Sequence, residues 1–434
     1  MSEVIKEDKV VDKDYPLGHV PLSARKGLVS ISAVLLGFTF FSPTMLAGAQ
    51  LGAAFSLKPL MIVLVAGSVI LGLYVAIMCL LGAKTGLTSV LLSRYTLGKG
   101  GAKWADIILG GTQIGWYAVT SAYMGDLFAK GLGLTGWAVG FTVFWAVVMG
   151  ITAVYGFKGM EIVSYFALPA ILILVIYIPY LGVKEVGGWE AMAALKPASA
   201  MSIGAAITVV VGTFASGGTQ AANWSRFAKT GFTGFWAGLI AFLLGNGLMI
   251  FSGMIGALAF NNGDLVEVMI AMNITVLALI ILTMNIWTTN NATAYAFGVA
   301  GAELFNKPNK RPFIIGGVLI AIVLAVTGIY KNFIPMLVLF GTFIPPLGGV
   351  IIGDFFFTYK GKLPNIETVE FKNIRIAPLA AYILGSAAAY FGGRFAVGIP
   401  PLQGIIIAAL AVPVMNAVIK AFGFDDNHKI KGAN

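Results

Sequence analysis

The sequence predicts an all-α integral membrane protein with twelve transmembrane helices in a five-plus-five inverted repeat, with helices 1 and 6 broken. The first observation is composition: the 434 residues are 58% hydrophobic and only 11% charged, with mean hydropathy +0.90. A water-soluble chain would carry about 25% charged residues. The other two observations are a series of long apolar runs and two interruptions at corresponding places.

The chain divides into two tails and twelve apolar runs. Residues 1–27 mix acidic and basic residues without an apolar core and cleavage site, which predicts a cytoplasmic tail rather than a signal peptide. A helix needs about 20 apolar residues to cross the hydrocarbon layer. Such runs lie near 28–52, 59–83, 103–130, 136–155, 162–183, 202–223, 232–260, 274–300, 313–330, 332–357, 376–392 and 399–421.

These runs suggest a division into repeats. We expect the first repeat, helices 1–5, at 28–183 and the second, helices 6–10, at 202–357. Helices 11–12 would follow at 376–421, and a C-terminal tail at 422–434. An even number of spans places both termini on one side of the membrane.

The basic residues indicate which side that is. With the termini inside, 22 of the 28 Lys and Arg residues fall in inner segments and 6 in outer ones. An excess of Lys and Arg in cytoplasmic segments is the usual topology signal. We therefore expect both termini in the cytoplasm. The outer residues are Lys58, Lys130, Lys184, Lys196, Lys331 and Arg394.

The first and sixth spans contain helix-breaking residues. Pro43 follows a Gly37-Phe38-Thr39-Phe40-Phe41-Ser42 run, and paired glycines close the sixth-span segment from Gly212 to Gly218. Either break alone could be an ordinary kink. Two breaks one repeat apart are typical of inverted-repeat transporters, whose sites lie at the interrupted helices.

The tenth span contains Pro345-Pro346 followed by Gly348-Gly349. This pattern predicts a bend or a flexible segment, which could be a gate hinge or a structural kink.

Several kinds of site are disfavoured. The net charge of +10 is spread over short connectors, so no continuous basic face for nucleic acid is expected. Cys79 is the one cysteine, and His19 and His428 lie in polar end segments, where we expect them to be solvated. Disulfides and thiolate or histidine metal clusters are therefore not expected.

The acidic residues of the spans lie near span ends. They are Asp106, Asp126, Glu161 and Asp354. A carrier driven by a buried carboxyl would be expected to show an acid at mid-span, so proton coupling is disfavoured. The charge-free centres also favour a substrate without strong net charge, although an anionic group could still lie at half-helix N-termini.

The eighth span offers oxygen ligands for a monovalent cation. Asn285, Thr288 and Thr289 share one helix face at i, i+3 and i+4. Two hydroxyls and the Asn285 carbonyl, with the carbonyls of Gly37 and Phe40 in the first break, would give five neutral oxygens. That set suits sodium better than a divalent ion. The alternative, equally weighted on this pattern, is that both hydroxyls bond back to their own helix.

The third span offers a face for a flat ring. Gln113 and Trp116 share a face at i and i+3, between small residues. An amide can both donate and accept hydrogen bonds at a heterocycle's edge, and an indole can stack on it. Phe214 could close the opposite face, and Phe41 could line the side. The alternative, which this pattern alone favours, is plain helix packing.

Four segments together resemble the bacterial cytosine permeases of the nucleobase-cation symporter (purine-cytosine permease) family. They are Pro21 to Gly27, Gly110 to Trp116, Asn285 to Asn290, and Ile344 to Ile352. The likeness covers nearly the whole chain in order. It implies the inverted-repeat fold of sodium-coupled leucine transporters and sodium-driven cytosine uptake across the bacterial inner membrane by alternating access.

The resemblance also implies roles for single residues. Trp116 and Phe214 would sandwich the pyrimidine, and Gln113, Asn285 and Ser216 would hydrogen-bond its edges. Sodium would be bound by Gly37, Phe40, Asn285, Thr288 and Thr289. Thr213 stands where the family is expected to have Ser, so its contact with substrate is open. Beyond cytosine, sodium and the lipid bilayer, no cofactor or partner is expected, and the monomer is expected to function.

Other functions remain as alternatives. The nearest is the same fold carrying uracil, allantoin or a hydantoin, or coupled to protons. A channel or a membrane-embedded enzyme is a more distant alternative, since the spans show no nucleophile, acid or metal cluster of the kind that catalysis needs.

Overall fold

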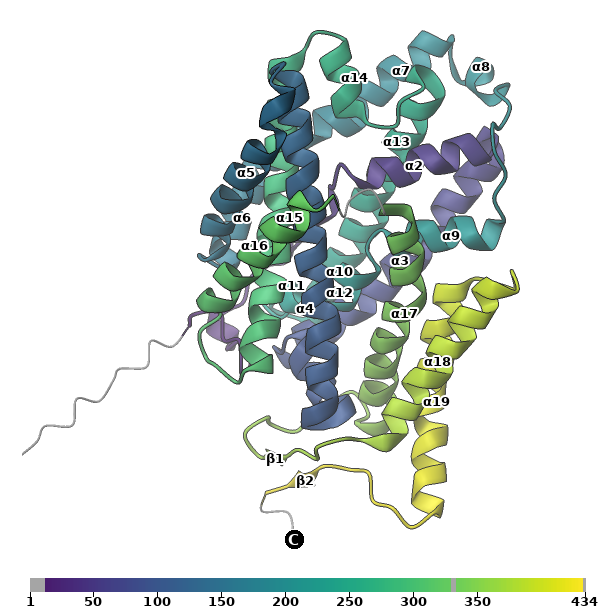
Figure 1. Ribbon diagram of the computed structural model, residues 1–434. Coiled ribbons are helices and arrows are strands. Elements are labelled where there is room, and N and C mark those ends of the chain that lie inside the picture. The colour runs from purple at the N-terminus through teal and green to yellow at the C-terminus, as the bar shows by residue number, and fades with distance from the viewer. Residues whose placement is uncertain (1–11, 329–332, 432–434) are drawn as a thin grey trace, which may run out of the picture.

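The computed structural model describes residues 12–328 and 333–431 of the chain. Long helices stand side by side, and the short strands β1 (Val369–Glu370) and β2 (Lys429–Ile430) pair antiparallel at one end (Figure 1). In these ranges seven helices are long and apolar enough to cross a membrane, or eight if one bent pair is a single span. The predicted all-α membrane fold is confirmed.

The first five spans are helical throughout most of their predicted length. They are α1 (Leu28–Thr39) with α2 (Thr44–Ala54), α3 (Leu57–Thr85), α4 (Ser89–Gly131), α5 (Ala138–Ala153), and α6 (Phe157–Leu172), which continues through a π-helical stretch (Ile173–Tyr177) into α7 (Ile178–Val186). A short 3-10 turn (Leu22–Ala24) precedes α1, another (Thr135–Trp137) precedes α5, and α8 (Trp189–Ala193) follows α7.

The next five spans are also helical. They are α9 (Ile203–Gly212) with α10 (Ala215–Thr219) and α11 (Ala222–Ser225), then α12 (Gly231–Ile240), a π-helical stretch (Ala241–Asn246) and α13 (Gly247–Phe260), then α15 (Thr275–Leu304), α16 (Arg311–Val326), and α17 (Phe333–Gly353) ending in a π-helical turn (Asp354–Thr358). The small helix α14 (Leu265–Ala271) precedes α15. The predicted ninth and tenth spans meet at residues 329–332, outside the described residues.

The last two spans, α18 (Ile376–Arg394) and α19 (Pro400–Ala421), pack against α17 at one side of the molecule (Figure 1). The twelve-helix arrangement and the inverted repeat are consistent with this fold. The tail predictions for residues 1–11 and 432–434 lie outside the described residues.

Both predicted breaks are present. The axes of α1 and α2 differ by 61°, and Pro43 stands immediately before α2, where its missing N–H costs no hydrogen bond. Phe40 ends α1 in an extended conformation. In the sixth span, α9 stops at Gly212 and Phe214 leaves the helical region with φ −133° and ψ 23°. Two interrupted helices therefore expose backbone groups inside the protein.

The proline pair of the tenth span does not interrupt its helix. α17 continues through Pro345 and Pro346. The two glycines that follow serve close packing: Gly348 faces the Tyr74 hydroxyl of α3, and Gly349 lies against the backbone of Ile405 in α19. A side chain at either position would collide with these neighbours.

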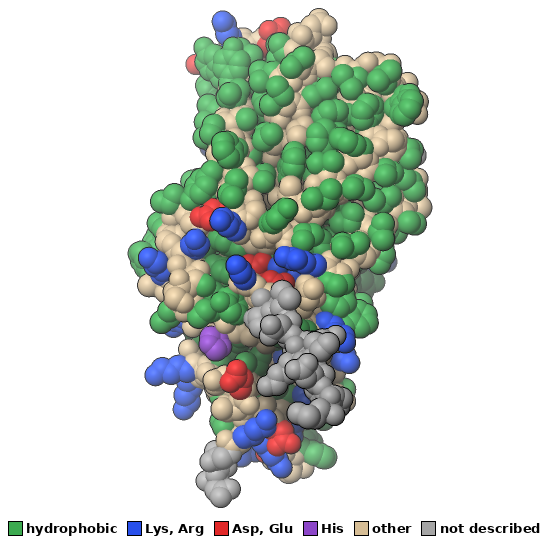
Figure 2. All heavy atoms as spheres, turned by 90° about the vertical axis from the view of Figure 1, so that its left-hand side faces the viewer, with side chains coloured by type: hydrophobic (Ala, Val, Ile, Leu, Met, Phe, Trp, Pro, Cys, Tyr) green, Lys and Arg blue, Asp and Glu red, His purple; other side chains and the backbone are tan. Residues whose placement is uncertain are grey.

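A broad hydrophobic band covers the upper part of the face in Figure 2, and charged side chains gather in its lower part. At that lower end the first described residues are held by buried cations. Lys310, which is 2% exposed, forms ion pairs with Asp12 and Asp14, with N–O distances of 2.9 and 2.7 Å. Arg226 is fully buried and donates to the carbonyls of Asp14 and Tyr15. The segment before α1 is therefore fixed to the helix ends.

The C-terminal segment is also fixed, which corrects the expectation that His428 is solvated. The His428 ring is half-buried; its Nδ1 accepts from the backbone N–H of Lys372 at 3.1 Å, and its Nε2 lies 2.8 Å from the Tyr95 carbonyl. Asp426 accepts from the first backbone N–H groups of α18. Tertiary contacts with residues at least 49 positions away in the sequence order this tail. His19 is exposed, as expected.

Acidification is expected to loosen this C-terminal segment. Burial, and then the positive charge of Arg375, lower the pKa of His428 from 6.5 to about 4. Between those values the unfolded segment binds a proton that the folded one does not, so stability falls as pH drops through that window. Hydrogen exchange of residues 425–431 should accelerate on acidification in the wild type. The variant His428→Gln should lack this pH-dependent part; an identical pH dependence in both proteins would refute the assignment to His428.

Candidate functional site

The two broken helices meet α4 and α15 at a small cavity in the protein interior. Its volume is only about 10 Å³, because the side chains around it nearly fill it. The residues that line it come from α1, the α1–α2 break, α4, the α9–α10 break, α10 and α15: Phe38, Phe41, Gln113, Trp116, Thr213, Phe214, Ser216, Gly217, Thr289 and Thr293. Six of the seven residues predicted to contact substrate are among them, and the seventh, Asn285, is bonded to the break in the first span.

Gln113 and Ser216 form the polar edge of the cavity. The Gln113 Nε2 donates to the Ser216 Oγ at 3.2 Å, and both side chains are at most 2% exposed. Gln113 lies on α4 and Ser216 on α10, one residue after the break ends. The predicted amide and hydroxyl are therefore adjacent. Together they offer a donor and an acceptor to a ring edge.

Aromatic rings form the walls. The Trp116 ring lies 5.6 Å from Phe41 and 5.8 Å from Phe340, measured between centroids. Phe214 lies 5.8 Å from Phe41 and 5.1 Å from Phe38, in edge-to-face arrangements. Flat apolar faces with a polar edge suit a planar heterocycle.

Asn285 of α15 forms hydrogen bonds with the break between α1 and α2. Its Oδ1 accepts from both the backbone N–H and the hydroxyl of Ser42, each at 2.7 Å. Asn285 is fully buried, and its Nδ2 has no hydrogen-bond partner in the described ranges. A buried donor without a partner is costly, so a ligand that supplied an acceptor here would be stabilised.

Thr213 lines the cavity, but its hydroxyl is engaged elsewhere. It donates to the Val210 carbonyl at 2.7 Å, and it accepts from the Asn246 Nδ2 of the seventh span at 2.9 Å. The part of Thr213 left for a ligand is chiefly its methyl group.

Four of the five predicted cation ligands lie together: Phe40, Asn285, Thr288 and Thr289. The Thr289 Oγ1 lies 3.2 Å from the Phe38 carbonyl, 3.4 Å from the Phe40 carbonyl and 3.3 Å from the Asn285 carbonyl. The end of α1 leaves its last carbonyls without helical partners, and they face this hydroxyl.

Thr288 agrees in part with the alternative prediction, in which the hydroxyl bonds back to its own helix. Its Oγ1 bonds back to the Asn285 carbonyl at 2.8 Å and to the Met284 carbonyl at 3.2 Å. Gly37 packs against it: a Cβ on Gly37 would lie 3.3 Å from the Thr288 Cβ and 2.5 Å from the Ser164 Oγ of α6. Neutral oxygens from three spans therefore surround this point, which is the chemistry a hard monovalent cation prefers.

Sequence reasoning missed several residues of this site. They are Phe38, Ser42, Asn246, Thr293 and Phe340. Phe38 and Ser42 stand inside the predicted break and could have been proposed from it. Asn246, Thr293 and Phe340 give no local signal, since their positions depend on how distant helices pack.

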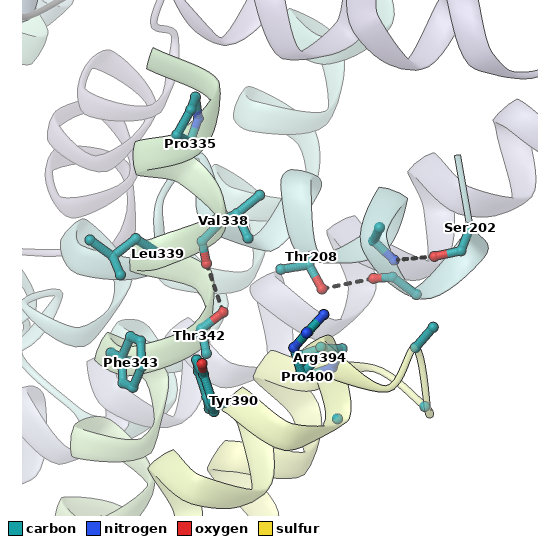
Figure 3. Close-up of a pocket in the computed structure, with 16 residues that line it drawn as sticks. Ser202, Thr208, Pro335, Val338, Leu339, Thr342, Phe343, Tyr390, Arg394 and Pro400 are labelled. Atoms are coloured by element: carbon teal, nitrogen blue, oxygen red, sulfur yellow. Dashed lines mark hydrogen bonds between the residues drawn. The ribbon is translucent and has the colours of Figure 1, made fainter. Parts of the chain in front are cut away.

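A second, larger cavity lies outside this site. Figure 3 shows it between α9, α17 and the α18–α19 turn, with a volume of about 340 Å³ and a mostly apolar lining that includes Arg394. It shares no residue with the first cavity. Thr208 and Thr342, which also line it, bond to carbonyls of their own helices.

Comparisons with known proteins give the chain its family. Residues 19–416 match the family described as permease for cytosine/purines, uracil, thiamine and allantoin. The chain is 34% identical over 411 residues to the cytosine permease of Escherichia coli strain K12, covering 94% of this chain and 95% of the relative.

Solved structures show the same fold at low sequence identity. A closed, bromovinylhydantoin-bound structure of Mhp1, a nucleobase-cation-symport-1 family transporter, is similar with TM-score 0.79 and 17% identity, covering 93% of this chain and 95% of that one. A Na⁺-coupled sialic acid symporter is similar with TM-score 0.63 and 11% identity, covering 98% and 94%. These relatives are permeases and transporters, not enzymes. The chain belongs to the family of membrane permeases for cytosine/purines, uracil, thiamine and allantoin.

Proposed function

We propose that this protein takes up cytosine together with sodium across the bacterial inner membrane by alternating access, with both termini in the cytoplasm. The observation that carries the substrate assignment is the cavity itself: aromatic walls, a neutral polar edge and no charged lining residue. Cytosine is neutral at pH 7, so stacking faces and neutral hydrogen-bonding groups suffice to bind it. The cytosine permease relative supports the same substrate.

In this proposal Trp116 and Phe214 stack on the ring, with Phe41 at its side. Gln113, Ser216 and Asn285 bond its edges, and Thr213 contributes its methyl group. Sodium lies between α1 and α15, bound by Gly37, Phe40, Asn285, Thr288 and Thr289. The Thr289 hydroxyl and the three carbonyls around it, from Phe38, Phe40 and Asn285, support this. The Na⁺-coupled sialic acid symporter of the same fold supports sodium as the ion.

The proposal includes how the two ligands are coupled. Asn285 contributes a carbonyl on the cation side and an amide on the substrate side, and that amide is bonded to Ser42 in the first break. A cation held at the break would therefore order the residue that contacts the substrate. The two repeats, proposed at 28–183 and 202–357, would then rock to expose both ligands inside. No second subunit is needed for this cycle.

Uptake of labelled cytosine into proteoliposomes tests the proposal. An inward sodium gradient should drive accumulation, and an equal potassium gradient should not. Unlabelled cytosine should compete better than uracil, allantoin or a hydantoin. Accumulation that ignores the sodium gradient would reject sodium coupling, and stronger competition by another ring would reassign the substrate.

The variant Thr289→Ala should raise the sodium concentration for half-maximal uptake about tenfold or more. It removes one ligand from a charged group, which corresponds to roughly 1.5–3 kcal/mol. Thr283→Ala is the matched control on α15, because the Thr283 hydroxyl is also buried but bonds only to the Leu279 carbonyl. Equal sodium dependence in the two variants would contradict the cation site.

A further inference from the structure

Asp106 is a buried acid that the proposed cycle does not use. It lies on α4 and is 2% exposed, and neither carboxyl oxygen has a hydrogen-bond partner in the described residues. In the sequence it lies near the end of a predicted span. The structure places it inside the protein, beside an apolar cluster that contains Ala105, Leu109 and Ala300.

Asp106 is in line with the substrate cavity. It precedes Gln113 by seven residues, which is two helical turns and about 10.5 Å along α4, on nearly the same helix face. It is therefore displaced from Gln113 toward the beginning of α4. That end lies beside the C-terminal segment, since Tyr95 contacts His428. If the cavity opened toward that end along this face of α4, the opening would reach Asp106.

A second buried acid faces it from α15. Gly110 of α4 lies against Ala300 of α15, and Thr120 bonds to Asn290, so the two helices run in opposite directions. Asp106 and Glu303 therefore lie about one turn beyond the Gly110 contact on facing helices. The Glu303 Oε1 accepts from the Arg94 Nε at 2.6 Å and is ion-paired with its Nη2, whereas Oε2 has no partner. Arg94 thus compensates Glu303, and Asp106 has no such partner in the described ranges.

The charged groups around Asp106 are few. They are Glu303 on α15 and Arg94 and Lys103 on α4. Lys103 is exposed and forms no ion pair with Asp106 among the described residues. Three other helices that pack on α4 contain no acidic or basic residue: α5, α10 and α17. The single basic residues of α16 and α18 are at helix ends: Arg311 and Arg394.

We propose that Asp106, facing Glu303, is a proton-binding site that holds a proton while this end of the transporter is closed and releases it when α4 and α15 separate there. A lone carboxylate in apolar surroundings is unfavourable, and a proton neutralises it without needing a shell of ligands. Three carboxyl oxygens in an apolar cluster are too few for sodium, which binds through several oxygens. On opening, water would hydrate Asp106, and the proton would leave to solvent.

The site is distinct from the proposed sodium site between α1 and α15. It would make the transport cycle sensitive to pH on the side where α4 begins, in addition to its dependence on sodium. Only the second of the two tests below rests on the proposed transport function.

The first test is infrared spectroscopy of the purified full-length protein in lipid nanodiscs at neutral pH. The spectrum of the wild type minus that of Asp106→Asn should contain the carbonyl band of a protonated carboxylic acid, shifted by deuterium oxide. Asp126→Asn, the same change farther along α4, is the matched control and should keep the band. A wild-type spectrum that loses no acid band on Asp106→Asn overturns the proposal, whether or not the protein transports cytosine.

The second test is cytosine uptake under a fixed sodium gradient as pH is raised from mildly acidic to alkaline. Wild type and Asp126→Asn should share one pH profile, and Asp106→Asn should flatten it. Asp106→Glu, which restores a carboxyl, should recover the pH dependence and so separates a proton-binding role from a folding defect. An unchanged profile in Asp106→Asn, or a flat profile in Asp106→Glu, overturns the proposal.

Discussion

Replacing Trp116 with alanine is expected to weaken cytosine binding about tenfold to a hundredfold. Stacking of a base on an aromatic side chain contributes roughly 1–3 kcal/mol, and each 1.4 kcal/mol is a factor of about ten in affinity. Trp116 is 6% exposed and forms one wall of the cavity, so its removal also leaves Phe41 and Phe340 without their shared neighbour. Equilibrium binding of labelled cytosine to the purified protein measures the effect.

Two companion variants make this result specific. Trp116→Phe keeps an aromatic face and should recover much of the affinity. Trp137→Ala removes a tryptophan that is 66% exposed and should bind as the wild type does. Unchanged cytosine affinity in Trp116→Ala would remove this residue, and with it the cavity, from the substrate site.

Replacing Arg375 with alanine is expected to destabilise the protein by about 3–5 kcal/mol, the usual cost of leaving one partner of a buried ion pair alone. The Arg375 Nη1 lies 2.6 Å from the Asp354 Oδ2, and the two side chains are 0% and 1% exposed. Arg375 also donates to the carbonyls of Tyr95 and Asp426. Its loss would therefore release both the start of α4 and the C-terminal segment.

Thermal unfolding in detergent, at matched protein concentration, measures this effect. Arg394→Ala is the control, because Arg394 is exposed and its loss should change the unfolding temperature little. The double variant Asp354→Asn with Arg375→Met should be more stable than Arg375→Ala, since no unpaired charge then stays buried. A similar unfolding temperature for Arg375→Ala and Arg394→Ala would show that the pair is not a major source of stability.

Local sequence signals predicted the framework of the fold well. Apolar runs as long as the bilayer is thick predicted the spans, because crossing the lipid depends on the length and apolarity of the segment itself. The break in the first span was predictable because Pro43 acts on its own helix. In the sixth span the break lies at Thr213 and Phe214, before the paired glycines, which are part of α10. Gln113 and Trp116 could be placed on one face because helical periodicity is local.

Contacts between distant segments could not be predicted in this way. The bond from Ser42 to Asn285 joins residues 243 positions apart, and Asn246 meets Thr213 only because the sixth and seventh spans pack together. The ion pairs of Lys310 with Asp12 and Asp14 could not be predicted either, because the composition of residues 1–27 is that of a solvated tail. The sequence did not predict the orientation of the Thr288 and Thr289 hydroxyls, because a hydroxyl can hydrogen-bond to a carbonyl of its own helix or to one of a neighbouring segment.

The bond between Ser42 and Asn285 fixes which way the amide faces. A backbone N–H can only donate, so the Asn285 oxygen must be the atom that meets Ser42, and the amide cannot turn over to suit a different ligand. In the proposed site, Asn285 would therefore recognise only an acceptor, such as the ring carbonyl that cytosine and uracil share. Discrimination between an exocyclic amine and a second carbonyl would then depend on Gln113 and Ser216, because the Ser216 hydroxyl can rotate to donate or to accept. We expect substitutions of those two residues, rather than of Asn285, to shift the preference toward another pyrimidine.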